Sequence, residues 1–119
     1  MTLRTVDLFA GCGGLSLGFQ KEKYNIVAAF ELWDAAVKCY KENFSHSVYQ
    51  TDLSNVDEAV KIIRELKPDI IIGGPPCQDF SHAGKRIEAD RASLTDSYAK
   101  IICAIKPRGF VMENVERAR

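Results

Sequence analysis

Short apolar runs of strand length alternate with helical patterns along this chain. The five runs predicted as strands are Thr5–Phe9, Ile26–Phe30, Ser47–Gln50, Ile70–Gly73 and Gly109–Met112. Helical patterns start near Leu15, Asp34, Ser54 and Ser93 and fill most of the space between them. Alternation of this kind is typical of a parallel sheet covered by helices on both faces. The sequence therefore predicts an α/β fold with a doubly wound, mostly parallel sheet of about five strands.

Length and composition set the class of protein. With 119 residues, 46% of them apolar, the chain can bury one ordinary core, so one domain is expected. The 16 basic side chains balance the 16 acidic ones, and net charge gives a DNA-binding role no support. No apolar run approaches the roughly 18 residues of a membrane span, and the N-terminus lacks a signal-peptide pattern. We expect a cytoplasmic protein without membrane contact.

The four cysteines are widely and unevenly spaced. They form neither the close pairs of a zinc site nor the dense pattern of a disulfide scaffold, so we expect free thiols and no metal. Cys12, Cys39 and Cys103 lie in a glycine turn and two helical stripes, which predicts small packing residues.

A glycine-rich turn follows the first predicted strand in the segment Asp7-Leu8-Phe9-Ala10-Gly11-Cys12-Gly13-Gly14. Backbone in such a turn can approach a nucleotide-like ligand closely, although a turn that only packs a helix onto a strand is the alternative. A dinucleotide fingerprint needs glycine or alanine at position 16, where Ser16 stands, and no Gly-Lys-Ser/Thr follows the turn. NAD is therefore disfavoured, and a nucleoside-triphosphate P-loop is excluded.

Three further side chains follow successive predicted strands. Glu31 can accept hydrogen bonds from both hydroxyls of a ribose. Trp33 can stack on an adenine ring, or can belong to the core. Asp52 can accept a hydrogen bond from an adenine amino group, or can stabilise a turn. Because the ends of parallel strands share one crevice, the three together predict a ligand site more strongly than each alone.

A cysteine held on a rigid turn follows the fourth predicted strand, in Gly73-Gly74-Pro75-Pro76-Cys77-Gln78-Asp79-Phe80-Ser81. Cys77 lies outside the apolar setting of a structural cysteine, and a thiolate suits addition to an electron-poor ring carbon. Glu113 ends the fifth predicted strand, beside the fourth in a doubly wound order. It is a candidate acid for the same reaction, with a simple capping role as the alternative. Residues 82–92 are predicted to be an exposed loop.

These segments, with Glu113-Asn114-Val115, resemble the bacterial cytosine-C5 DNA methyltransferases in order and spacing. The resemblance covers essentially the whole chain. It implies a Rossmann-like class I methyltransferase fold, S-adenosylmethionine as methyl donor, and double-stranded DNA as substrate, as in restriction-modification systems.

The resemblance also implies residue roles. Cys77 would be the nucleophile and Glu113 would hold the cytosine, with Pro76 contacting the flipped base and Asn114 ordering the turn. Cofactor contacts are implied at the motif positions Asp7, Phe9, Gly11, Gly13, Gly14, Leu15, Glu31, Leu32, Trp33, Asp52, Leu53, Pro75 and Leu94.

The family's arginine-rich segment, target-recognition region and C-terminal segment have no counterpart within the 119 residues. We therefore expect an S-adenosylmethionine-binding and catalytic portion that needs a second polypeptide or further sequence, and little activity from the chain alone. Two alternatives stay open: a non-catalytic remnant that binds S-adenosylmethionine or a partner, and a tRNA cytosine-C5 methyltransferase. The DNA target is not predictable, because the segment that reads bases is absent.

Overall fold

A five-stranded parallel sheet forms the centre of the molecule. The computed structural model describes residues 2–76 and 85–113, and side chains within 2–76 and 94–113. The strands are β1 (Arg4–Leu8), β2 (Asn25–Phe30), β3 (Ser47–Tyr49), β4 (Ile70–Gly73) and β5 (Gly109–Met112), in the spatial order β3-β2-β1-β4-β5. Every neighbouring pair is parallel. The predicted α/β fold and all five strands are confirmed, with ends displaced by at most one residue.

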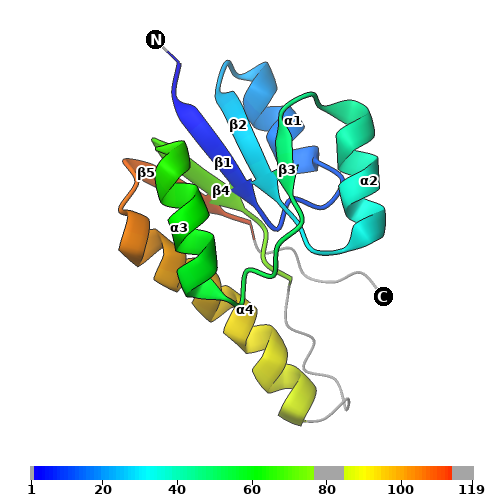
Figure 1. Cartoon of the computed structure of the whole chain (residues 1–119), viewed down its shortest axis with the longest axis vertical. Helices are drawn as coiled ribbons and strands as arrows, with labels where there is room; N and C mark the ends of the chain where they lie inside the picture. Colours follow the sequence, from blue (N-terminus) through cyan, green and yellow to red (C-terminus); the bar gives the residue numbers. More distant parts are fainter. Residues whose placement is uncertain (1, 77–84, 114–119) are drawn as a thin grey trace.

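Four helices cover the two faces of the sheet: α1 (Gly14–Lys21), α2 (Asp34–Asn43), α3 (Val56–Leu66) and α4 (Lys85–Ile105). Figure 1 shows α1 and α2 on one face and α3 and α4 on the other. Strand order reverses between β1 and β4, because the chain adds β2 and β3 on one side and then β4 and β5 on the other. Ligands of open parallel sheets bind beside such a switch point, at the carboxyl ends of the strands.

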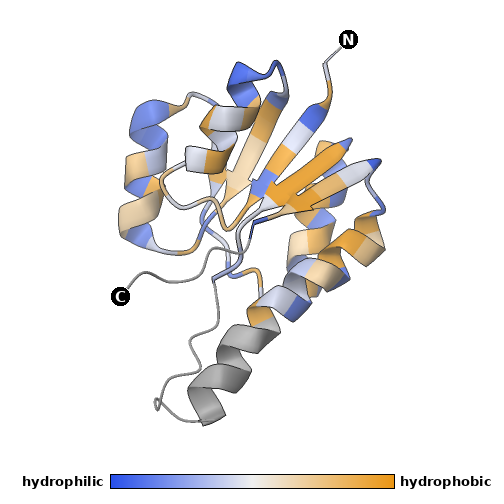
Figure 2. Cartoon of the chain, turned by 180° about the vertical axis from the view of Figure 1, so that it is seen from behind, coloured by the Kyte–Doolittle hydropathy of each residue, from blue (hydrophilic) through white to orange (hydrophobic). Residues whose placement is uncertain are grey.

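The core lies between the sheet and the helices. Its main cluster contains fully buried side chains of β1, β2 and β4, together with Ile63 of α3 and Tyr98 and Ile101 of α4. Figure 2 shows hydrophobic residues concentrated along the strands, while the outer faces of the helices are more polar. Near-continuous apolar strands are expected wherever helices cover both faces of a parallel sheet.

Residues 85–92 correct a sequence prediction. They were expected in an exposed loop, but α4 starts at Lys85 and runs without interruption to Ile105. The segment contains no glycine or proline after Gly84 and is rich in lysine, arginine, glutamate and alanine, which are good helix formers. The loop prediction relied on the lack of an apolar period, which marks only helices that bury one face against a core.

One edge of the sheet leaves apolar side chains uncovered. On β5, Phe110 is 56% exposed, and Val111 and Met112 are each 42% exposed. β5 pairs with β4 on one side only. No helix of the described residues is long and apolar enough to cross a membrane.

Candidate functional site

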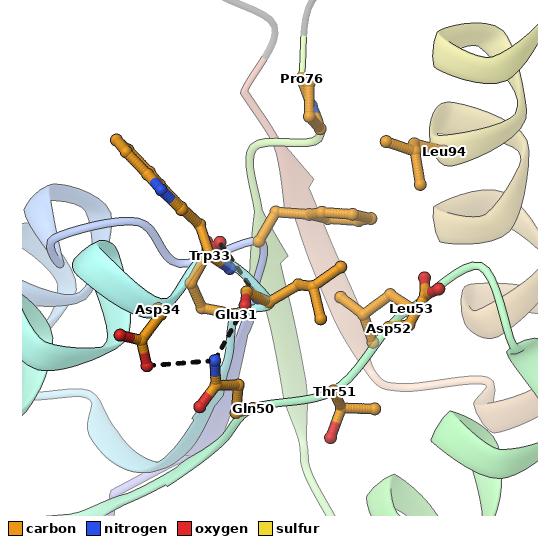
Figure 3. A pocket seen from close by; sticks show the side chains of 11 residues that line it. Glu31, Trp33, Asp34, Gln50, Thr51, Asp52, Leu53, Pro76 and Leu94 are labelled. Atoms are coloured by element: carbon orange, nitrogen blue, oxygen red, sulfur yellow. Dashed lines mark hydrogen bonds between the residues drawn. The ribbon is translucent and has the colours of Figure 1, made fainter.

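A pocket of about 520 Å³ opens at the carboxyl ends of the strands. Figure 3 shows side chains from the ends of β2, β3 and β4 and from α4 converging on it. Eight of the predicted site residues are among its eleven lining residues: Phe9, Glu31, Leu32, Trp33, Asp52, Leu53, Pro76 and Leu94. The volume lies within the range of small-molecule sites, about 300–1,000 Å³. The shared crevice expected from parallel strand ends is therefore present.

Glu31 fastens the glycine turn to the end of β2. Its Oε1 accepts a hydrogen bond of 2.8 Å from the backbone N–H of Gly11. Its Oε2 accepts bonds of 3.0 and 2.9 Å from the backbone N–H groups of Leu32 and Trp33. The carboxylate thus lines the pocket and also orders its own surroundings, while its bond to a ribose stays a prediction.

Trp33 stands at the pocket with 69% of its surface exposed, so the core alternative is wrong for this indole. Asp52 has the turn-stabilising role, while its bond to an adenine amino group stays a prediction. It lines the pocket, and its Oδ1 accepts hydrogen bonds from the Ser54 hydroxyl (2.7 Å) and backbone N–H (3.0 Å). These bonds, that of the hydroxyl above all, lower the pKa of the Asp52 carboxyl. The pocket wall therefore carries an ionised carboxylate at this position.

The glycine turn has the backbone that only glycine adopts without strain. Gly11 and Gly13 have φ values of 59° and 104°. A Cβ on Gly13 would lie 2.3 Å from Phe44 Cε2 and 3.0 Å from Tyr40 Cδ2. The described lining of the pocket does not include six of the predicted cofactor contacts, which are Asp7, Gly11, Gly13, Gly14, Leu15 and Pro75. Their cofactor contacts stay predictions.

Asp7 is buried beneath this turn rather than on the pocket wall. It is 0% exposed, and its Oδ2 accepts a 2.5 Å hydrogen bond from the Ser16 hydroxyl. Its Oδ1 is buried and has no hydrogen-bond partner within the described part of the chain. Burial raises the pKa of the Asp7 carboxyl to about 7, against the opposing effect of the Ser16 bond, and Glu31 and Glu113 raise it further. A direct contact between Asp7 and a cofactor stays a prediction.

The turn after β4 leads out of the sheet towards the pocket. A Cβ on Gly73 would lie 2.6 Å from both the Leu8 carbonyl oxygen and Tyr98 Cε2, so this close approach requires glycine. Pro75 is buried, whereas Pro76 is exposed and lines the pocket. Cys77, the predicted nucleophile, lies outside the described residues.

Glu113 follows β5 and lies beside the start of this turn. Its backbone N–H donates a 2.8 Å hydrogen bond to the Gly73 carbonyl. Its Oε1 would lie 3.7 Å from a Cβ placed on Gly74. The predicted pairing of β5 with β4 is confirmed, and Glu113 lies beside Gly73 and Gly74, while its nearness to Cys77 stays a prediction. Asn114 lies outside the described residues.

Sequence reasoning missed three lining residues, Asp34, Gln50 and Thr51. Gln50 Nε2 donates to the Leu32 carbonyl (3.1 Å) and to Asp34 Oδ1 (3.5 Å). Asp34 directly follows Trp33, Thr51 directly precedes Asp52, and Gln50 ends the third predicted strand, so the same strand-end argument would have found them. The expected packing role is wrong for Cys12 and Cys103, which are exposed. Within the described residues, no three His, Cys, Asp or Glu side chains gather as a metal site would require.

The family model and the most similar proteins name one family. A family model described as C-5 cytosine-specific DNA methylase matches residues 3–119. Type II methyltransferase M.HindV of Haemophilus influenzae is 58% identical over 98% of this chain, which spans 39% of that protein. Type II methyltransferase M.HgiGI of Herpetosiphon aurantiacus is 54% identical, again over 98% of this chain, which spans 94% of that relative.

Among solved structures, a chain described as a DNA modification methyltransferase encoded within an E. coli prophage superposes with a TM-score of 0.80. It is 32% identical, and the match covers 96% of this chain and 32% of that chain.

Proposed function

Because the chain belongs to the C-5 cytosine-specific DNA methylases, we propose that it transfers a methyl group from S-adenosylmethionine to carbon 5 of cytosine in DNA. The observation that carries the proposal is the pocket at the carboxyl ends of the strands. The pocket, of about 520 Å³, reaches Pro76, the residue immediately before the candidate nucleophile.

The pocket residues suit S-adenosylmethionine. Glu31 offers a carboxylate at the end of β2, Trp33 an exposed indole, and Asp52 an ionised acceptor for the adenine amino group. Phe9, Leu32, Leu53 and Leu94 supply the apolar part of the wall. When bound, S-adenosylmethionine supplies an electrophilic methyl group. The chain's own residues hold this group near the turn that carries Cys77.

The thiolate of Cys77 would add to C6 of the flipped cytosine, and the electron density that moves to C5 would take the methyl group as its bond to the sulfur of the donor breaks, leaving S-adenosylhomocysteine. A base then removes the C5 proton, and the pair released from that bond expels the thiolate. Addition at C6 places charge on N3, where the carboxyl group of Glu113 acts as hydrogen-bond partner and acid. Pro76 and Asn114 would hold the base and the turn.

DNA recognition is assigned to a further segment or second polypeptide. The chain spans 39% of the length of M.HindV, and its charges sum to zero, which does not suit strong phosphate binding. The exposed apolar side chains of β5 offer a surface to such a polypeptide. Residues 1–119 then form the cofactor-binding and catalytic portion of a cytoplasmic enzyme that acts on nucleoid DNA. Alone, the chain is expected to be inactive or weakly active.

Covalent trapping tests the proposal. The chain, alone and mixed with the product of an adjacent gene, is incubated with S-adenosylmethionine and duplex DNA containing 5-fluorocytosine. The fluorine blocks loss of the C5 substituent, so the expected result is a denaturant-stable adduct that maps to Cys77. It should disappear in Cys77→Ser and persist in the control Cys103→Ser.

The other outcomes distinguish the alternatives. Binding of S-adenosylmethionine without an adduct in any mixture would support the non-catalytic remnant. An adduct on 5-fluorocytosine RNA but not on DNA would make the substrate RNA. A normal methylation rate by the chain alone would contradict the need for a second polypeptide.

A further inference from the structure

A series of hydrogen bonds links Asp7, near the carboxyl end of β1, through α1 and α2 to His46, which directly precedes β3. Ser16 Oγ lies 2.5 Å from Asp7 Oδ2 and 2.8 Å from the Tyr40 hydroxyl, which in turn lies 2.5 Å from His46 Nε2. Asp7, Ser16 and Tyr40 are each 0% exposed, and His46 is half-buried. None of the four lines the pocket.

When Asp7 is ionised, each hydrogen bond of this series has a definite donor and acceptor. The single Ser16 proton is donated to the carboxylate, so Ser16 accepts from the Tyr40 hydroxyl. The Tyr40 oxygen must then accept from His46, which requires a proton on Nε2. Burial lowers the pKa of His46 and raises the pKa of Tyr40, so both stay neutral near pH 7. Each bond of such a chain polarises the next.

Tyr40 also packs against the glycine turn, together with Phe44. The rings of Tyr40 and Phe44 stack with centroids 4.4 Å apart, and both lie where a Cβ on Gly13 would fall. The His46 ring packs on both, with centroid distances of 5.4 Å to Tyr40 and 5.3 Å to Phe44. Ser16 lies in the first turn of α1, two residues after Gly14. The turn is thus packed against the rings on one side and bonded through Ser16 on the other.

We propose that Tyr40 and His46 are positioning residues, which hold the glycine turn, through Ser16 and Asp7, in the conformation that receives S-adenosylmethionine. The proposal rests on the proposed function of the pocket. Gly11 connects the turn to the pocket, because its N–H donates to Glu31 Oε1. A turn that loses its support from Tyr40 would no longer present this N–H and Glu31 in fixed positions, so the cofactor would have to order them on binding.

Tyr40→Phe is the central variant, because it keeps the stacked ring and removes only the hydroxyl between Ser16 and His46. Tyr24→Phe is the matched control, since Tyr24 packs edge-on against Phe19 at the far end of α1. Isothermal titration should give a dissociation constant for S-adenosylmethionine that is about three- to tenfold higher in Tyr40→Phe and unchanged in the control. His46→Ala should weaken binding in the same way, and His46→Gln, which retains an N–H donor, should restore part of it.

Two readouts need no cofactor. Amide hydrogen exchange across residues 11–17 should be faster in Tyr40→Phe than in wild type or Tyr24→Phe, with exchange in β4 unchanged. In ¹⁵N spectra at pH 8, wild-type His46 should carry its proton on Nε2. In Ser16→Ala the Tyr40 hydroxyl loses its acceptor and turns to His46, so the proton of His46 should move to Nδ1.

The outcomes separate the two proposals. Wild-type affinity and wild-type exchange of residues 11–17 in Tyr40→Phe would overturn the positioning role. If His46 has the same tautomer in wild type and in Ser16→Ala, the assigned donors and acceptors of these hydrogen bonds are wrong. Failure of the wild-type chain to bind S-adenosylmethionine would contradict the proposed function. Amide hydrogen exchange of residues 11–17 and the His46 tautomer would still test the positioning role.

Discussion

At the scale of single residues, Gly13 and Glu31 show how the site is held in shape. Gly13 combines a left-handed backbone with a close approach of two aromatic rings. Glu31 uses its carboxylate to collect three backbone N–H groups around the pocket. Both residues therefore serve the geometry of the site before any ligand arrives.

Gly13→Ala should lower the free energy of unfolding by about 1–3 kcal/mol, because the added methyl group meets Phe44 and the backbone is strained. Gly18→Ala is the matched control: Gly18 lies within α1 with no atom within 4 Å of a Cβ, so alanine should be neutral or stabilise by up to about 1 kcal/mol. Urea denaturation of both variants checks the difference. Equal effects would mean that the turn relaxes freely.

Trp33→Ala should separate binding from stability. Since the indole is 69% exposed, its removal should change the free energy of unfolding little. Loss of stacking should raise the dissociation constant of S-adenosylmethionine about two- to tenfold. Phe110→Ala, an exposed aromatic outside the pocket, serves as control in the same calorimetric titration. Unchanged affinity in Trp33→Ala would remove the indole from the cofactor site.

Asp7 should make stability depend on pH in an unusual direction. Its native pKa of about 7 exceeds the ordinary 3.8, so between these values the folded state holds a proton that the unfolded state has lost. The contribution of Asp7 to stability is therefore full below about pH 4 and falls as the pH rises to about 7.

Asparagine does not titrate, so the stability of Asp7→Asn relative to wild type should increase between pH 4 and 7 and then level off. Urea denaturation at pH 5, 6, 7 and 8 measures this difference. Parallel curves for the two proteins would show that the native carboxyl titrates normally.

At the scale of elements, α4 and β5 are joined by Tyr98. Its hydroxyl donates a 2.7 Å hydrogen bond to the Val111 carbonyl, and its ring packs where a side chain on Gly73 would lie. Burial raises the pKa of Tyr98, so the hydroxyl stays a donor throughout the physiological range. This contact orients the strand that carries Glu113.

Tyr98→Phe should cost about 0.5–1.5 kcal/mol of stability, because the ring stays and one hydrogen bond is lost. Tyr24→Phe, at the opposite end of the molecule, should cost less. Chemical denaturation gives both values, and equal losses would mean that the Tyr98 bond contributes nothing.

At the scale of the whole molecule, the apolar edge at β5 and the neutral charge both favour a protein that works with another segment or polypeptide. Phe110→Ser should change stability by less than about 1 kcal/mol, since the side chain is half-exposed. It should reduce the Cys77 adduct formed with a complementing polypeptide. Leu17→Ser, a half-exposed site on α1, is the control. Equal adduct yields would place the partner's contact elsewhere.

The sequence by itself determined the strands, the strand-end residues of the pocket and the family. The apolar period and the glycine turns are signals carried by short stretches of sequence. Glu31, Trp33 and Asp52 line one pocket because the carboxyl ends of parallel strands lie at the same edge of the sheet. The sequence did not reveal that residues 85–92 are helical, because the prediction relied on an apolar stripe, which this segment lacks.

Only the tertiary structure decided that Trp33 is exposed, that Asp7 is buried away from the pocket, and that Tyr40 is hydrogen-bonded to both Ser16 and His46. Those facts depend on contacts between residues far apart in the chain. A side chain's partners follow from how helices and strands pack in three dimensions, which no short stretch of sequence encodes.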